Sequence, residues 1–492
     1  METRSDKFKY FSISIIFLVL SRIVAQAFRI VARIIIARYS TSEIFGIFSV
    51  IWNEMSLVGL VALIGLGQQL TIDLPRKNKK EKNQMIYSSL FFSLLLCIII
   101  AIVSLILNLI NIENTYKYSL IIAVFFVLFL LCQFILIGLK DFFGVFLLFL
   151  IQNLSLLLMI VLLRNQLSID NIVYATAGSI ALASVSLLIY IIIKYRYTIK
   201  EIKKEELKVF DFSTRRLYLF IVDIVDSVVL YLLVKLPQLF LGSSYAGFVS
   251  IAFAIMSFVL ILPQIITISL GPLVSEEYIN ENYEKMHRSF RTSMSLIYLL
   301  QGIAVLVFIY FGNPIIELLY GSEYVSGTFY IFYGFLLAVV IDSFTYPFGL
   351  YLRNTSHENL FGLGKIVSLF FFVAFEVLLL YLMQDTMAIP IAYIISKIAL
   401  LAFYLYSAIK HNDRINKIDI RKLLVWLSII FVSFILTLVI NHFFENLLYR
   451  ALFLILNLAL FMLSIALFKI VNLKQLVREI ISKISSKSVN KT

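Results

Sequence analysis

The stretch FSISIIFLVLSRIVAQAFRIVARIIIA, residues 11–37, is long and apolar enough to span a membrane, yet it carries three arginines. On a helix each residue advances about 100°, so Arg22, Gln26, Arg29 and Arg33 fall within a sector of about 60°. An arginine near the bilayer centre costs at least about 2.5 kcal/mol. Three arginines on one face therefore predict a wet, positively charged interior.

The composition predicts a polytopic membrane protein. Of the 492 residues, 61% are hydrophobic and 14% are charged, whereas soluble proteins have roughly 25% charged residues. The two cysteines and four histidines have no disulfide or metal-binding spacing, so we expect no metal and no cofactor. The sequence contains neither a P-loop nor a GxSxG motif, and we expect a transporter and not an enzyme.

The predicted fold class is all-α integral membrane with about 14 transmembrane helices. Residues 236–275 carry no charge, and we place the turn between two spans there at Gly242-Ser243-Ser244. The predicted spans are 11–37, 43–67, 84–110, 118–139, 142–163, 171–193, 217–241, 245–270, 292–312, 325–349, 360–383, 388–409, 423–443 and 450–470.

Lysines and arginines predict the orientation of these spans. With the N-terminus inside, 32 of the 42 basic residues fall on the cytoplasmic side, four fall outside and six lie within spans. We therefore expect both termini to be cytoplasmic and the protein to lie in the cytoplasmic membrane. The net charge of +13 is a topology signal, which argues against a nucleic-acid partner.

The N-terminus imitates a signal peptide, because an apolar run precedes the small residues of AQA, 25–27. Arg22 interrupts that junction and the apolar pattern continues to Ala37, so we favour a retained first span.

Two basic cytoplasmic segments divide the predicted spans into blocks. We expect parallel six-helix repeats that rock around a central site, and an amphipathic tail that binds membrane lipid. The predicted parts are an N-terminal lobe at 1–193, a linker at 194–216, a C-terminal lobe at 217–409, helices 13–14 at 410–470 and the tail at 471–492.

Ionisable residues inside spans are candidates for function. Arginine binds phosphate bidentately, so the arginine face with Gln26 predicts a diphosphate site, to which we add Lys397 of span 12. Glu54 lies at a depth between Arg22 and Arg29, and we expect it to pair with one of them. Five acids inside the predicted spans are candidates: Glu54, Asp223, Asp226, Asp342 and Glu376. They are predicted either to couple ions or to pair across helices, and in the second case they would only fix the packing.

Four fragments together resemble the polysaccharide-transporter branch of the multidrug/oligosaccharidyl-lipid/polysaccharide (MOP) flippase superfamily. They are ARYSTSEIFGIFSV (37–50), LIGLGQQLTIDLPR (63–76), LPQIITISLGPLVSEEYINENYEKMHRSFR (262–291) and FGNPIIELLYGSEYVSGTFYIFY (311–333). The sequence departs from the family pattern at the start of span 12, where Pro390 stands, and in the acidic span 7.

This resemblance implies a MATE/MOP-like fold and a flippase of the kind that moves O-antigen or capsular repeat units. The substrate would be an oligosaccharide linked to undecaprenyl diphosphate, and a polysaccharide polymerase could be a partner. The resemblance also implies that Arg22, Arg29 and Arg33 line the central cavity. Three alternatives stay open: a cation-coupled multidrug exporter, a peptidoglycan-precursor flippase, and a membrane polysaccharide polymerase or glycosyltransferase.

Overall fold

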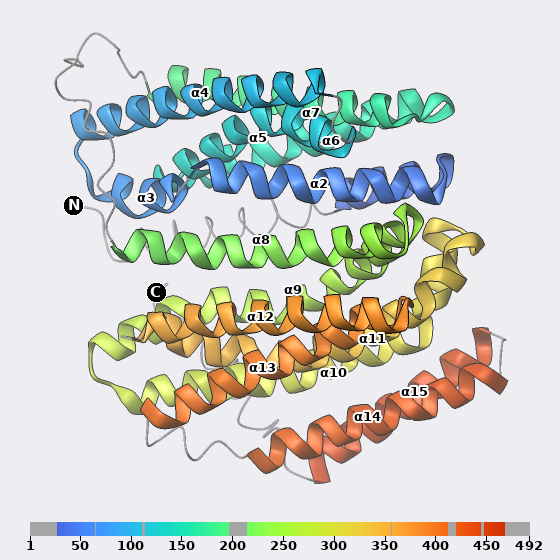
Figure 1. Ribbon diagram of the computed structural model, residues 1–492. Coiled ribbons are helices and arrows are strands. Elements are labelled where there is room, and N and C mark those ends of the chain that lie inside the picture. Colours follow the sequence, from blue (N-terminus) through green and yellow to red (C-terminus); the bar gives the residue numbers. More distant parts are fainter. Residues whose placement is uncertain are drawn as a thin grey trace, which may run out of the picture. The chain divides into compact units, whose positions relative to one another are not determined.

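The structure is a computed structural model that describes residues 27–63, 65–110, 114–195, 214–355, 357–411, 420–443 and 447–467 (Figure 1). Arg22, Gln26, most of the predicted linker and the predicted amphipathic tail lie outside these residues. The described part is almost entirely helical, which confirms the predicted all-α fold class.

Within the described residues, eleven helices are long and apolar enough to cross a membrane. The chain is thus a multi-pass membrane protein, as predicted, while the number fourteen and the side of the termini stay predictions. These helices are α2 (Ser42–Leu63), α4 (Lys79–Leu109), α5 (Asn114–Gly138), α6 (Phe142–Leu163), α7 (Ile169–Tyr195), α9 (Ser243–Ile279), α10 (Tyr283–Tyr320), α11 (Ser322–Asn354), α12 (Glu358–Met383), α13 (Ala388–His411) and α15 (Leu447–Leu467).

The other described segments are shorter or more polar. A helix over 27–39 carries the second half of the arginine face. The remaining helices are α3 (Leu66–Asp73), η1 (Leu74–Arg76), η2 (Arg164–Gln166), α8 (Thr214–Phe240) and α14 (Ile420–Phe443).

Glycines with positive φ lie at three described junctions between helices, Gly65, Gly242 and Gly321. Gly242, with φ 113°, separates α8 from α9 and confirms the predicted turn at that position. Helix α2 ends at Leu63, and Gly65, with φ 75°, is the N-cap of α3, so the predicted single span 43–67 is wrong in its last residues. Glycine reaches positive φ without the steric cost of a Cβ atom.

The chain divides into two compact units, the first unit (Met1–Ser250) and the second unit (Ile251–Thr492). Helix α8 lies in the first unit and packs against α2, although we expected it to open the C-terminal lobe. The predicted lobe boundary at 194–216 stays a prediction.

Each unit is built around one central helix. In the first unit α5 packs against α2, α4, α6 and α7, and in the second unit α11 packs against α10, α12 and α13. Both central helices are the fourth predicted span of their six-span block, and α6–α7 and α12–α13 are matching pairs. This shared packing order fits the expected parallel repeat.

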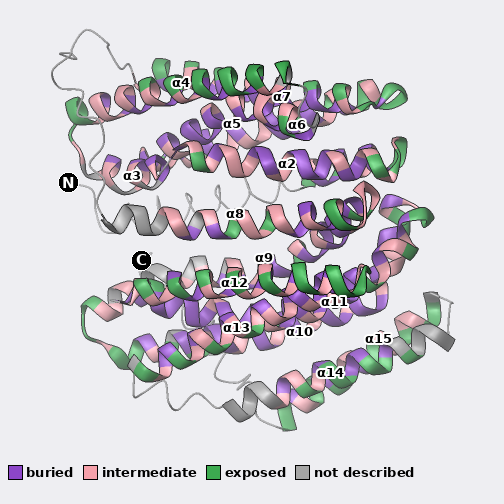
Figure 2. Cartoon of the chain, viewed as in Figure 1, coloured by how far each residue is buried: buried purple, intermediate pink, exposed green. Residues whose placement is uncertain are grey.

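The burial pattern reflects lipid as the solvent. Large apolar side chains of α4 are exposed, including Phe91, Ile98 and Leu105, whereas the residues of α5 are mostly either buried or intermediate (Figure 2). An apolar face of this kind is stable when it contacts hydrocarbon chains.

Candidate functional site

The described part of the arginine face consists of Arg29 and Arg33, one helical turn apart and both half-buried. The guanidinium of Arg33 lies 5.6 Å from the centre of the Trp52 ring on α2, within cation–π distance. This contact holds Arg33, one of the predicted diphosphate-binding residues, against α2.

Glu54 of α2 is only 3% exposed and is held by groups from two other helices. Ser119 of α5 donates a hydrogen bond to Glu54 Oε2 over 2.6 Å. From α8, Lys235 Nζ lies 3.4 Å from Glu54 Oε1 and Tyr231 donates to the same oxygen over 3.5 Å. The predicted pairing of Glu54 with Arg29 is therefore wrong within the described residues.

Helix geometry explains this pairing. Trp52 and Glu54 are two residues apart, so their side chains point about 200° apart around α2. The Trp52 face meets the helix over 27–39, as its contact with Arg33 shows. The opposite face carries Glu54 toward α5 and α8.

Lys235 is a buried cation that is not among the predicted site residues. It is 3% exposed, and its Nζ also lies 4.9 Å from the centre of the Tyr116 ring. A signal was present, because a lysine deep in an apolar helix needs an anion, and Glu54 is the acid that lies mid-span in the first block.

Of the two aspartates predicted on α8, only Asp226 has a described side chain. Asp226 is exposed, and the side chain of Asp223 lies outside the described part of the chain. Their proposed role in ion coupling stays a prediction.

The second unit contains a similar buried ion pair between α13 and α11. Lys397 Nζ lies 3.1 Å from Asp342 Oδ2 and 4.9 Å from the centre of the Tyr393 ring. Thr345 donates a hydrogen bond to Asp342 Oδ1 over 3.0 Å. The carboxylate balances the charge of Lys397, which we had grouped with the phosphate-binding arginines.

Glu376 differs from the other predicted acids because it has no polar contact within the described residues. Its side chain on α12 is fully buried, and neither carboxyl oxygen has a hydrogen-bond partner there. The structure thus does not bring Glu376 together with the Lys397–Asp342 pair.

Outside the spans, the turn between α5 and α6 carries a further charged cluster. Asp141 accepts hydrogen bonds from Lys194, Tyr190 and Tyr195 of α7, over 2.7, 3.0 and 2.9 Å. Burial by itself raises the pKa of Asp141, but these bonds and one from the Gly144 N–H bring it below its ordinary value. The cluster ties the start of α6 to the end of α7.

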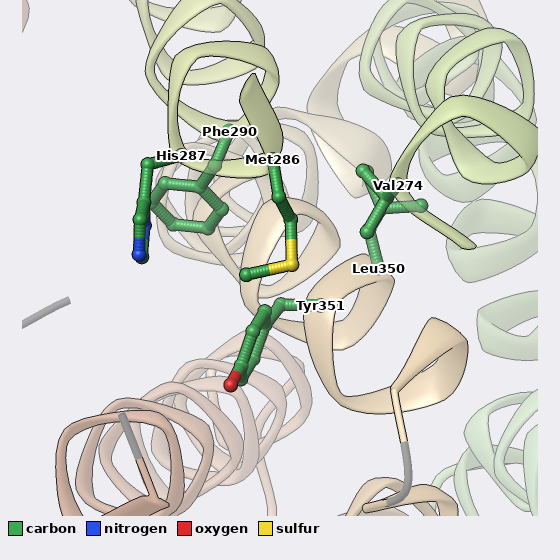
Figure 3. Close-up of a pocket in the computed structure, with 6 residues that line it drawn as sticks. All are labelled: Val274, Met286, His287, Phe290, Leu350 and Tyr351. Carbon is green, nitrogen blue, oxygen red and sulfur yellow. The ribbon is translucent and has the colours of Figure 1, made fainter. Parts of the chain in front are cut away.

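A small apolar hollow lies in the second unit among α9, α10 and α11 (Figure 3). Its lining contains none of the residues that the sequence analysis selected, and its polar groups belong to His287 and Tyr351. Within the described residues, no three histidine, cysteine or acidic side chains are grouped to hold a metal. The full lining is Val274, Met286, His287, Phe290, Leu350 and Tyr351.

Comparison with known proteins identifies the fold. The MatE family model matches residues 227–357. An inward-facing multidrug resistance MATE family transporter of the MOP superfamily aligns with a TM-score of 0.66 at 13% identity, covering 82% of this chain and 99% of that one. No curated protein matches the chain.

Two further structures have the same fold. The lipid II flippase MurJ, in an inward closed conformation, aligns with a TM-score of 0.65 at 14% identity over 92% of this chain and 99% of that one. A MOP superfamily transporter from Pyrococcus furiosus, described as having a binding pocket of reverse polarity, has a TM-score of 0.57 at 14% identity, covering 80% and 94%. The chain therefore has the MATE/MOP-type fold, as its sequence predicted.

Proposed function

We propose that this protein flips lipid-linked oligosaccharides, whose carrier is undecaprenyl diphosphate, across the cytoplasmic membrane by alternating access. The observation that carries the proposal is the pair Arg29 and Arg33, two half-buried cations one turn apart on the helix over 27–39, which belongs to the predicted span 11–37. The MATE/MOP-type fold supports transport as the general activity.

The chemistry of arginine favours an anionic headgroup. A guanidinium keeps its charge at any physiological pH and can donate two parallel hydrogen bonds to one phosphate. Buried lysines of this chain are balanced by carboxylates, Lys235 by Glu54 and Lys397 by Asp342. Arg33 also lies over the Trp52 ring at cation–π distance, which holds its guanidinium against α2.

In this proposal the diphosphate binds to the first unit through the face that carries Arg22, Gln26, Arg29 and Arg33. Lys397 is assigned a secondary role, because it must first separate from Asp342 to meet an anion. A polysaccharide polymerase that takes up the flipped unit is the partner that this function implies.

A peptidoglycan-precursor flippase is the second candidate, since the lipid II flippase MurJ shares the fold over 92% of this chain. Both candidates move a lipid with a charged headgroup. A multidrug exporter is also compatible with the fold, but a cationic drug would be repelled by Arg29 and Arg33. A membrane polymerase has no supporting observation in the described residues.

The proposal is tested with purified protein in liposomes that contain a fluorescent oligosaccharide linked to undecaprenyl diphosphate. We expect the protein to increase movement of this lipid between leaflets, and Arg29→Ala to abolish the increase. The matched control is Arg353→Ala, because Arg353 is an exposed arginine at the end of α11.

Parallel liposomes distinguish the candidates. Faster movement of a lipid II probe than of the oligosaccharide lipid would favour the peptidoglycan-precursor flippase. Transport of a cationic dye without movement of either lipid would contradict the proposed function and favour an exporter.

A further inference from the structure

The strongest feature that the proposed function leaves unused is the buried carboxyl of Glu376. It lies seven residues before the end of α12 at Met383, which is about 10 Å along the helix from that end. Its side chain is 0% exposed, and neither oxygen has a hydrogen-bond partner within the described residues. A carboxyl group in this state needs an explanation, because buried polar groups are normally paired.

Contacts between α12 and α13 show what Glu376 faces. Ser368 donates a hydrogen bond to the Ser396 carbonyl over 3.2 Å, and the rings of Phe372 and Tyr393 lie 6.0 Å apart. The helices are antiparallel, so four residues beyond Phe372 on α12 correspond to four residues before Tyr393 on α13. Glu376 therefore lies level with Ile389.

The surroundings at this level of α13 are apolar. Ala388, Ile389 and Ala392 are all 0% exposed. Lys397 lies eight residues beyond Ile389, or about 12 Å along the helix, and it is held by Asp342 at 3.1 Å. Lys397 is therefore too far along α13 to neutralise Glu376.

Helix α11 contributes no charge at this level either. A Cβ atom at Gly334 would lie 2.4 Å from the Pro390 side chain, so α11 meets α13 one residue from the level of Ile389. The Tyr333 hydroxyl donates to the Ile309 carbonyl over 3.1 Å. Tyr333 of α11 and Tyr393 of α13 are titratable residues close to this level, and the Tyr333 ring contacts Phe434 of α14.

An ionised Glu376 would be very unfavourable in this environment. Transfer of an isolated carboxylate into an apolar interior costs far more than transfer of a neutral group, and proteins avoid that cost by taking up a proton. A positively charged group must therefore neutralise the Glu376 carboxylate. No described side chain hydrogen-bonds to it, and a proton is small enough to bind there.

We propose that Glu376 is a proton-binding site of the second unit, occupied while α12 and α13 are packed as in this structure. Separation of the two helices would hydrate the carboxyl and release the proton. The site lies near the end of α12 that precedes the exposed residues Gln384 and Asp385, so water has only about two helical turns to cross. This inference does not depend on the transported substrate.

The test is infrared spectroscopy of the purified protein in detergent at neutral pH, without substrate. We expect the carbonyl stretch of a neutral carboxylic acid, with loss of intensity in Glu376→Gln and reversible loss in the wild type when the pH is raised. Glu317→Gln should leave the band unchanged, because Glu317 is exposed on α10. Asp342→Asn should also leave it unchanged, because Asp342 is ion-paired.

Thermal unfolding provides the second measurement. Glu376→Gln and Glu376→Met should shift the Tm less than Asp342→Asn, which leaves Lys397 without its counter-ion. An unchanged carbonyl band in Glu376→Gln would show that Glu376 is ionised and would overturn the proposal. Failure of both Glu376 variants to fold would overturn it as well, since a neutral buried carboxyl tolerates a neutral replacement.

Discussion

Lys235 Nζ lies 3.4 Å from Glu54 Oε1, and this buried ion pair connects α8 to α2 inside the first unit. Ser119 and Tyr231 bind the same carboxylate, so three helices meet at one charged group. The pair joins a helix from each of the two predicted six-span blocks. It is therefore a contact that any rearrangement of α8 against α2 has to break.

We predict that breaking this pair from either side destabilises the protein. Glu54→Gln leaves Lys235 buried without an anion, and Lys235→Met leaves Glu54 without its cation. Each single substitution is expected to cost about 3–5 kcal/mol. Thermal unfolding in detergent measures the loss.

The double variant Glu54→Gln/Lys235→Met is the control for this cycle. It removes both charges and should recover most of the stability, because an apolar pair avoids the desolvation cost. Additive losses in the double variant would show that the two residues stabilise the fold independently.

Gly46 is predicted to tolerate no side chain. A Cβ atom there would lie 1.7 Å from the Ser243 carbonyl oxygen, so α2 could not keep its approach to the start of α9. Gly46→Ala should lower stability by about 1–3 kcal/mol. Gly178→Ala is the matched control, because the nearest atoms there, in Met159, lie at 3.6 Å. Equal Tm values for the two variants would contradict the close contact.

Asp141 is predicted to give a pH-dependent contribution to stability. Its pKa is lowered below the ordinary value of 3.8 by hydrogen bonds that outweigh its burial, so folding favours the charged form. The contribution is complete above about pH 4 and is lost as the pH falls through the lower folded-state pKa. Asp141→Asn should therefore lower the Tm at neutral pH, with a difference that shrinks below that range.

Unfolding curves of both proteins between neutral pH and about pH 3 measure this dependence. Asp385→Asn serves as control because Asp385 is exposed in the turn before α13. If the difference between wild type and Asp141→Asn stayed constant over the whole range, the carboxylate would not be the group responsible.

A lysine at position 29 is predicted to retain only part of the transport activity that Arg29 supports. It keeps the positive charge but loses the planar group that binds a phosphate with two hydrogen bonds. Arg29→Lys should reduce movement of the diphosphate lipid in liposomes, and Arg29→Ala should abolish it. A lysine variant with full activity would indicate that charge alone is needed at this position.

Much of the fold follows from local sequence patterns. Apolar length predicts most of the described membrane helices, and Gly242 predicts the turn between α8 and α9. The break of α2 at Gly65 was missed because a single glycine inside an apolar run is also compatible with a continuous helix. The arginine face was visible because its spacing is a property of one helix.

The sequence by itself determined the membrane class, the approximate spans and the position of each charge along them. Hydropathy and helical periodicity depend on neighbours a few residues away. The tertiary structure decided which charges meet: Glu54 with Lys235, Asp342 with Lys397, and Glu376 with no polar partner among the described residues. Those outcomes depend on the rotation and register of helices that are far apart in the chain, which no local pattern specifies.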